Sequence, residues 1–251
     1  MNRLTAVYFS PTGGTKKAVL NFAENFQGYQ TECLDLTPPG QRAKEYRFGE
    51  NEIVIAGCPV YAGQIPQVQG LLRNIYGSNT PCVIMACYGN RHYDDALAQM
   101  QQILTEQGFT VIGGMAVIIP HIFSKILGAD RPDDKDRFIL QDFASQMADK
   151  IAQQNFAPIT VPGNGKPELK QPVAVDKIFH EERCNMCGAC LDLCPVNALS
   201  ADNMEQAGLE CISCMRCAKY CPTNAREVSY GRVTEWLESN FTAPREIEVF
   251  K

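Results

Sequence analysis

Eight of the twelve cysteines lie in one short stretch of the chain, as two sets of four with the same spacing. Both sets follow the pattern C-x-x-C-x-x-C-x-x-x-C-P, and they are Cys184, Cys187, Cys190 and Cys194, then Cys211, Cys214, Cys217 and Cys221. Iron prefers soft thiolate ligands, and four cysteines in this spacing are typical of [4Fe–4S] ligation. A zinc site would instead use paired C-x-x-C units with a gap of about a dozen residues between them. The repeat therefore predicts two [4Fe–4S] clusters.

The fourth cysteine of each set follows a longer gap, so it can reach the cluster of the other set. The expected ligands of one cluster are Cys184, Cys187, Cys190 and Cys221, and those of the other are Cys211, Cys214, Cys217 and Cys194. This stretch resembles bacterial-type two-cluster ferredoxins. A disulfide framework would need an oxidising compartment, whereas the chain begins MNRLTAVYFS without an apolar signal segment. We therefore expect reduced cysteines and a cytoplasmic location.

A loop rich in hydroxyls and glycines follows an apolar run at 4–9 and precedes a helical pattern. Its candidate cofactor contacts are Ser10, Thr12, Gly13, Gly14 and Thr15. A strand, such a loop and a helix start can bind phosphate, because backbone N–H groups and hydroxyls point at the anion. The loop lacks the G-K-[ST] of a nucleotide P-loop, and a capping turn that binds nothing is the alternative. It resembles the [ST]-x-T-G-x-T loop of flavodoxins, which implies the 5′-phosphate of FMN as its ligand.

The elements that must position this loop are visible as alternating patterns. Apolar runs predict further strands at 31–36, 52–57, 81–87 and 109–119, and amphipathic patterns predict helices at 66–76, 93–107 and 134–154. Strands that alternate with helices form a parallel sheet with both faces covered. The expected fold is therefore α/β, with a flavodoxin-like doubly wound five-stranded parallel sheet. Ligands of such sheets bind outside the carboxyl ends of the strands.

Two more loops leave the carboxyl ends of the predicted strands. Their candidate cofactor contacts are Pro59, Val60, Tyr61, Ala62 and Gly63 in the first loop, and Cys87, Tyr88, Gly89, Asn90, Arg91 and Tyr93 in the second. Each loop offers an aromatic ring that can stack on a flat ligand and glycines whose backbone can approach it. The motifs P-V-Y-x-G and Y-G-N-R resemble the flavin-binding loops of flavodoxin-like domains, which again implies FMN.

Individual side chains of these loops leave alternatives open. Tyr61 and Tyr88 are the stacking candidates, and either could instead be a rim aromatic. Arg91 is either a cation beside the flavin or a solvated loop residue. We expect His121 to be a hydrogen-bonded structural histidine. Cys33, Cys58 and Cys82 are expected to pack as small buried hydrophobes.

Composition divides the chain into two expected domains. We expect a flavodoxin-like FMN-binding domain at 1–155, a linker rich in proline and glycine at 156–175, and a small α+β two-[4Fe–4S] ferredoxin-like domain at 176–251. The last domain ends with a helix at 233–240 that carries the single tryptophan, and we expect this helix to pack on its own domain.

The net charge of −5 argues against a nucleic-acid partner, and no apolar run is long enough to cross a bilayer. The whole chain resembles the flavodoxin–ferredoxin fusion proteins of anaerobic bacteria and archaea. The resemblance implies electron transfer among FMN, two [4Fe–4S] clusters and other redox proteins in anaerobic metabolism. The alternative is a flavin-dependent oxidoreductase that reduces a small acceptor, such as a quinone, nitro compound, disulfide or metal ion. The sequence does not identify the donor, the acceptor or the oligomeric state.

Overall fold

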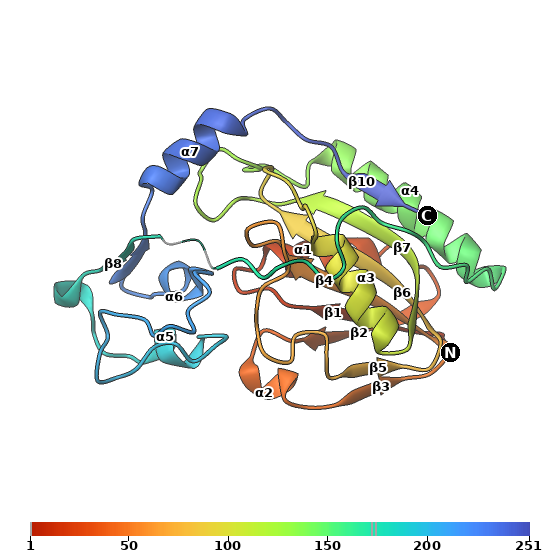
Figure 1. Ribbon diagram of the computed structural model, residues 1–251, viewed down its shortest axis with the longest axis horizontal. Coiled ribbons are helices and arrows are strands. Elements are labelled where there is room, and N and C mark those ends of the chain that lie inside the picture. Colours follow the sequence, from red (N-terminus) through yellow and green to blue (C-terminus); the bar gives the residue numbers. More distant parts are fainter. Residues whose placement is uncertain (1, 172, 174) are drawn as a thin grey trace.

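The computed structural model of the chain describes residues 2–171, 173 and 175–251. Residue 1 of the expected first domain and residues 172 and 174 of the expected linker thus lie outside the described residues. The centre of the molecule is a six-stranded sheet with the order β10-β7-β6-β4-β1-β2 (Figure 1). Five of its strands are parallel: β1 (Asn2–Tyr8), β2 (Tyr29–Asp35), β4 (Glu52–Pro59), β6 (Thr80–Tyr88) and β7 (Phe109–Ile118). Counted along the chain their order is 2-1-3-4-5, which is the flavodoxin-like order. The predicted fold class is confirmed.

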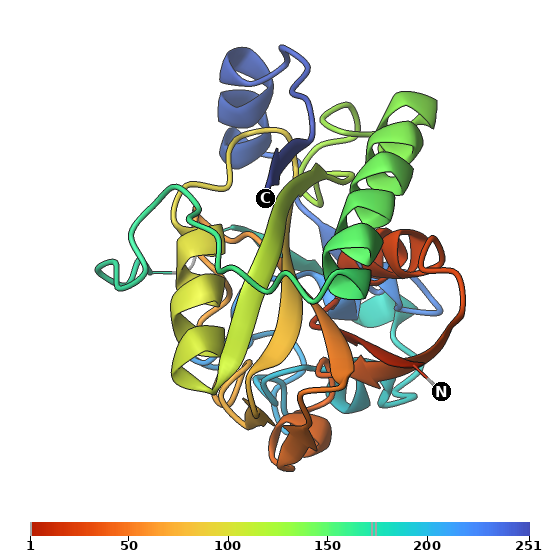
Figure 2. The ribbon, with the colours of Figure 1, turned by 90° about the vertical axis from the view of Figure 1, so that its right-hand side faces the viewer.

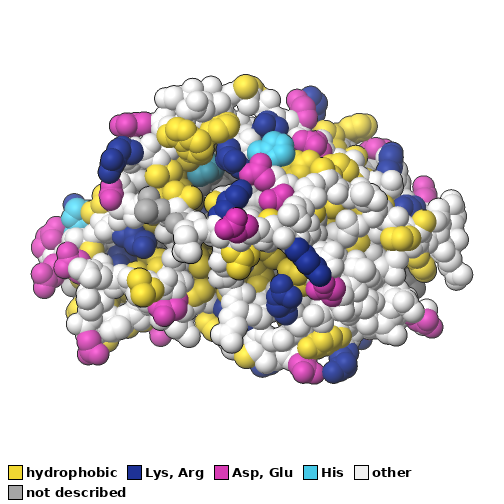
Figure 3. Space-filling model, viewed as in Figure 1, with side chains coloured by type: hydrophobic (Ala, Val, Ile, Leu, Met, Phe, Trp, Pro, Cys, Tyr) yellow, Lys and Arg dark blue, Asp and Glu magenta, His cyan; other side chains and the backbone are white. Residues whose placement is uncertain are grey.

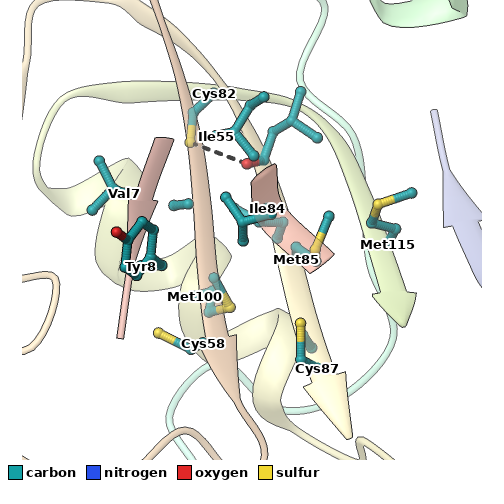
Figure 4. Packing of buried hydrophobic residues seen from close by; sticks show 14 of the residues in the cluster. Val7, Tyr8, Ile55, Cys58, Cys82, Ile84, Met85, Cys87, Met100 and Met115 are labelled. Atoms are coloured by element: carbon teal, nitrogen blue, oxygen red, sulfur yellow. Dashed lines mark hydrogen bonds between the residues drawn. The ribbon is translucent and has the colours of Figure 1, made fainter. Parts of the chain in front are cut away.

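Three helices cover the two faces of this sheet. α3 (Ala96–Glu106) lies on one face, and α1 (Gly14–Ala23) and α4 (Asp134–Ala152) lie side by side on the other (Figure 2). Phe22 of α1 stacks on Phe143 of α4 with ring centroids 5.9 Å apart. Every residue of β6 is buried, and β4 is buried from its second residue onward, which explains why both strands are apolar throughout. Figure 4 shows part of this packing, with Ile55, Ile84 and Met115 on neighbouring strands.

The predicted helix at 66–76 is wrong. This segment forms turns, and it ends in β5 (Ile75–Gly77), which pairs in parallel with β3 (Tyr46–Phe48) as a separate two-stranded sheet. Gly70 and Leu72 both have positive φ, at 75° and 59°, so the backbone cannot continue as a right-handed helix. Cys33 also differs from expectation, because it is exposed on the edge strand β2.

The sixth strand was not predicted, and it brings the end of the chain back to the first sheet. β10 (Glu248–Phe250) pairs antiparallel with β7. Asn90 holds the segment that leads to it, since its Nδ2 donates to Phe241 O at 2.6 Å and to Ala243 O at 3.0 Å. Its Oδ1 accepts from the N–H of Arg245 at 3.1 Å. Residues 248–250 thus belong to the sheet of the first domain.

The expected linker runs along the first domain. Ile159 and Val161 are buried in its core, and the N–H of Ile159 donates to Val111 O at 3.0 Å. Further along, Gln64 Nε2 donates to Glu168 O at 2.7 Å. The described part of this segment is therefore packed against the first domain, although its composition is that of a spacer.

The cysteine-rich block is small and has little regular structure. Its elements are the antiparallel pair β8 (Lys177–Phe179) and β9 (Arg226–Val228), the 3-10 turn η1 (Glu181–Arg183), and the short helices α5 (Ala189–Asp192) and α6 (Arg216–Lys219). The first domain also has a short helix, α2 (Pro39–Arg42).

The terminal helix packs on its own domain, as expected, and also on the first domain, which was not expected. α7 (Arg232–Asn240) places Leu237 in a cluster that contains Phe123 and Leu127 of the first domain and Met215 and Ala218 of the block. The apolar face of this short helix needs more surface than the small block offers. α7 thus joins the two halves. No helix in the described part of the chain is both long and apolar enough to cross a membrane.

Replacing Asn90 with alanine should lower the free energy of unfolding by about 2–4 kcal/mol, because three hydrogen bonds to the C-terminal segment are lost. Asn79 provides a matched control: it also has positive φ, at 54°, but it lies exposed in a turn. The free energies of unfolding of Asn90→Ala and Asn79→Ala are measured in guanidinium. Both variants place alanine at positive φ, so the difference between them reports the lost hydrogen bonds of Asn90. Equal destabilisation of the two variants would contradict the bracing role of Asn90.

Candidate functional site

The loop between β1 and α1 is fixed by its own side chains and by the end of β2. Ser10 Oγ accepts from the N–H of Lys16 at 2.9 Å, and the N–H of Ser10 donates to Thr37 Oγ1 at 2.8 Å. Gly13 has a φ of 88°, a conformation that glycine adopts without strain. α1 begins at Gly14, so the first N–H groups of the helix and the hydroxyls of the loop lie together. We call residues 10–15 the phosphate loop, after the ligand that the sequence predicts for it.

A cavity of about 710 Å³ opens beside this loop at the carboxyl ends of β1, β4 and β6. Its volume is within the range of small-molecule and cofactor sites. Eleven of the sixteen predicted cofactor contacts line it: Ser10, Thr12, Thr15, Pro59, Val60, Tyr61, Ala62, Cys87, Tyr88, Gly89 and Arg91. The three loops predicted from the sequence therefore do converge on one site.

The other five predicted contacts are not among the described residues that line the cavity: Gly13, Gly14, Gly63, Asn90 and Tyr93. Asn90 holds the C-terminal segment, and the hydroxyl of Tyr93 donates to Glu248 at 2.7 Å. A Cβ on Gly63 would lie 2.0 Å from the carboxylate of Asp94, so this glycine allows two loops to pack closely. Asn90, Tyr93 and Gly63 thus contact neighbouring segments of the chain.

The two tyrosines that could stack on a ring have different surroundings. Tyr88 is buried edge-on against Tyr93, with ring centroids 5.7 Å apart, and its hydroxyl has no partner among the described residues. Burial raises its pKa to about 12, while the charge of Arg245 in the C-terminal segment lowers the pKa and that of Glu248 raises it. Tyr61 is half-buried, and burial together with the nearby Cys214 thiol raises its pKa. Tyr61 thus lies between the cavity and the cysteine-rich block.

Arg91 is held in the cavity wall by an ion pair. Its guanidinium donates to the carboxylate of Asp94, which also contacts His92 Nδ1 at 3.0 Å. Burial alone would raise the pKa of Asp94, but the hydrogen bond and charge of Arg91 outweigh it and lower the pKa. Asp94 therefore partly neutralises the positive charge of Arg91, and Arg91 is not a free solvated side chain.

His121 also lines the cavity. Its Nδ1 accepts from the N–H of Phe123 at 3.1 Å, as expected for a hydrogen-bonded histidine. Burial lowers its pKa from 6.5 to about 4, so the ring is neutral near pH 7 and carries its proton on Nε2. A Cβ on Gly89 would lie 2.2 Å from the imidazole, so this glycine makes room for the ring.

Several other residues of the cavity wall were not predicted from the sequence. They come from α7 through Val233, Trp236 and Leu237, from Lys170 and Gln171 of the expected linker, and from Ile212, Ser213 and Cys214 of the block. Trp236 is 52% exposed, and its ring lies edge-on to Phe241 at 5.0 Å. An exposed tryptophan on a short terminal helix was the only local signal, because these contacts join segments far apart in the chain.

The eight cysteines of the block fall into two spatial groups. Cys184, Cys187, Cys190 and Cys221 line one small cavity. Burial raises the pKa of Cys214 to about 12, and the thiols of Cys217, Cys194 and Cys211 are close enough to raise it further. The sets of four are the ones that the spacing predicts, while ligation itself stays a prediction. The described residues contain no cluster of three or more His, Cys, Asp or Glu side chains placed to hold a single metal ion.

Comparison with known proteins identifies the block. The family model described as "4Fe-4S binding domain" matches residues 177–200 and 209–227. The block is an iron–sulfur domain of the ferredoxin type. No curated protein was found to match the chain in sequence.

Solved structures similar to this chain include three flavodoxins. One is from the domain Archaea (14% identity, TM-score 0.42, 60% of this chain and 99% of that one), and one is from Streptococcus pneumonia TIGR4 (14%, 0.39, 59% and 99%). The third is oxidised Flavodoxin 2 from Bacillus cereus (12%, 0.41, 59% and 99%). The flavodoxin-like fold is assigned from the strand order of the sheet. A flavodoxin-like fold joined to a 4Fe-4S domain supports an electron-transfer role.

The pH dependence of stability tests the environment of His121. Its folded pKa of about 4 lies below its usual 6.5, so the unfolded chain binds a proton that the folded chain does not. Stability should therefore fall by at most about 3 kcal/mol as the pH drops from 7 to 4. His121→Asn keeps an acceptor for the N–H of Phe123 but cannot titrate, so its melting temperature should fall less over this range. Identical profiles for the two proteins would contradict the assignment.

Proposed function

We propose that the protein transfers electrons between an FMN in the cavity and two [4Fe–4S] clusters in the ferredoxin-type block, and onward to other redox proteins. The observation that carries the proposal is that Cys214, an expected cluster ligand, lines the same cavity as the three flavodoxin-like loops. In such an arrangement, one cofactor site borders directly on the other. The domain limits and the cytoplasmic location expected from the sequence stay predictions.

The chemistry of the cavity suits FMN. One end carries the hydroxyls of Ser10, Thr12 and Thr15 beside the start of α1, where an anionic phosphate is favoured. The rest of the wall is mainly apolar, with Tyr61 and Trp236 as aromatic surfaces for a flat ring. When bound, FMN supplies a group that can take two electrons and release them singly, whereas each cubane carries one.

The residues of this chain hold and screen the flavin. The phosphate loop binds the anion, Tyr61 orients the ring, and α7 together with the segment at Phe123 limits water at the open side. His121 keeps a proton on Nε2 at the cavity wall, because its Nδ1 is occupied by the N–H of Phe123. Arg91 contributes a positive charge that Asp94 partly offsets.

The two cysteine groups lie at different distances from the cavity. Cys214 lines it, whereas none of the four cysteines of the Cys184 group is among its described lining residues. We therefore propose the order flavin, then the cluster of Cys194, Cys211, Cys214 and Cys217 (the near cluster), then the cluster of Cys184, Cys187, Cys190 and Cys221 (the far cluster). Cys187 and Met186 are exposed, so we expect the far cluster to lie at the surface, where a partner can reach it.

Charge suggests what kind of partner docks there. Acidic side chains gather on the surface of the block (Figure 3), and they include Glu181, Glu182, Asp192, Asp202, Glu205 and Glu210. Of the cations in the block, Arg226 is buried, and Arg216 and Lys219 are turned to the first domain. Exposed Arg183 is paired with Glu227, which leaves Lys177 as an exposed cation beside six exposed carboxylates. An acidic surface favours encounter with a redox protein that has a basic face.

The cofactor content tests the proposal directly. Protein purified without oxygen should carry one FMN, and about eight iron and eight sulfide per chain. Cys221→Ala should remove the far cluster and keep the near one, because Cys221 lies with Cys184, Cys187 and Cys190. Chemical analysis and the electron paramagnetic resonance spectrum of the reduced protein report both results. FAD in place of FMN, or loss of only the near cluster in this variant, would overturn the assignment.

The order of cofactors predicts how electrons reach the flavin. In rapid mixing with a one-electron donor, flavin reduction should proceed at a rate independent of protein concentration, because both sites are on one chain. Cys211→Ser, which removes a near-cluster ligand, should slow this step about tenfold or more. Cys187→Ser, which removes a far-cluster ligand, should leave direct transfer from the near cluster to the flavin intact. Slowing in Cys187→Ser alone would reverse the proposed order.

A further inference from the structure

Two cations of the ferredoxin-type block hold the phosphate loop of the first domain. Arg216 Nη1 donates to Pro11 O at 2.5 Å, and Lys219 Nζ donates to Thr12 O at 2.7 Å. Pro11 and Thr12 line the cavity, whereas Arg216 and Lys219 are not among the described residues that line it. Arg216 and Lys219 therefore bind the backbone of the loop from outside the cavity. Tyr220 lies beside them, with its hydroxyl 3.5 Å from the position that a Cβ on Gly13 would take.

These bonds fix the direction of the loop's N–H groups. In a planar trans peptide the N–H points away from the C=O. Because Pro11 O and Thr12 O are turned toward α6, the N–H groups of Thr12 and Gly13 point away from it. The N–H of Gly13 donates to Ser10 O at 3.3 Å, whereas the N–H of Thr12, which also points away from α6, has no backbone acceptor among the described residues. The two cations thus preorganise a backbone donor for an anion.

The cations also supply charge that the loop lacks. Residues 10–15 contain no cationic side chain. A phosphate monoester carries about −1.5 to −2 charges near pH 7, so two positive charges just behind the loop favour its binding. Arg216 is further held in place by the ring of Tyr220, at 5.1 Å from the guanidinium to the ring centroid.

The position of α6 depends on the near cluster. Cys217 lies within this four-residue helix, and Cys214 lies two residues before it. A helix this short is not stable by itself, so its place is set by what binds its cysteines and by the packing of Ala218. Ligation of Cys214 and Cys217 would therefore fix the two side chains that hold the phosphate loop.

We propose that assembly of the near cluster controls retention of the flavin phosphate, through Arg216 and Lys219 as positioning residues. This inference rests on the proposed function, since it takes FMN as the ligand of the loop. Coupling between two binding sites is reciprocal, so FMN also stabilises the near cluster. A chain without the near cluster would then release its flavin, and incomplete protein would not reduce oxygen or other acceptors at an isolated flavin.

The first experiment compares FMN with riboflavin, which lacks the phosphate, by titrating flavin-free protein that keeps both clusters. Arg216→Gln with Lys219→Gln should weaken FMN binding about tenfold or more, leave riboflavin binding unchanged and leave the iron content unchanged. Lys219→Gln alone, at an exposed position, should give a smaller loss in the same direction. Lys177→Gln, which removes an exposed cation of β8, is the matched control and should not change FMN affinity.

The second experiment measures the reverse coupling as iron release to a chelator without oxygen. Bound FMN should slow the release of about half of the iron in the wild type, and this protection should vanish in the double variant. Unchanged FMN affinity in the double variant, or equal loss for FMN and riboflavin, would overturn the inference. A wild type that binds neither flavin would instead overturn the proposed function itself.

Discussion

The buried guanidinium of Arg42 binds to both halves of the molecule. Arg42 donates to Leu36 O at 2.7 Å and Thr37 O at 2.6 Å, beyond the end of β2, and also to Pro195 O in the ferredoxin-type block. Its guanidinium lies 5.5 Å from the ring centroid of Phe9, and burial lowers its pKa. A buried cation needs all of these partners, since breaking such a set leaves an uncompensated charge. Pro195 follows Cys194, an expected cluster ligand, and Thr37 Oγ1 accepts from the N–H of Ser10. The Arg42 side chain therefore connects the segment of Cys194 with the phosphate loop.

This constraint makes the cavity a shared feature of both halves. The flavodoxin-like sheet supplies three loops at its carboxyl edge, and the block supplies Ile212, Ser213 and Cys214. The chain then crosses back through α7 and ends as β10 on the first sheet, so the block is connected to the first domain at both of its ends. A tether alone would raise the local concentration of one site for the other. Direct packing does more, because it fixes which group of cysteines borders the cavity.

The sequence was informative where the signal is local. Eight cysteines in a repeat, apolar runs buried on both faces, and loops at strand ends predicted the fold class, the sheet of five parallel strands and eleven lining residues of the cavity. The sequence did not predict the bend at 66–76 or the features that depend on contacts between residues far apart in the chain. The amphipathic segment at 66–76 is bent by Gly70 and Leu72, Asn90 and Tyr93 bind a C-terminal segment far away in the chain, and Leu237 packs across both halves. The proline-rich stretch looked like a spacer because burial of Ile159 depends on a surface that the stretch does not contain.

We expect the near cluster to lie beside the flavin, between the flavin and the far cluster. Diffraction at the iron absorption edge, from crystals of the anaerobically purified protein, would locate both clusters and the flavin in one map. We expect the iron site surrounded by Cys194, Cys211, Cys214 and Cys217 to be the one nearer to the flavin, across the wall formed by Tyr61 and Cys214. A flavin that lies closer to the iron of Cys184 and Cys187, or outside the cavity, would contradict it.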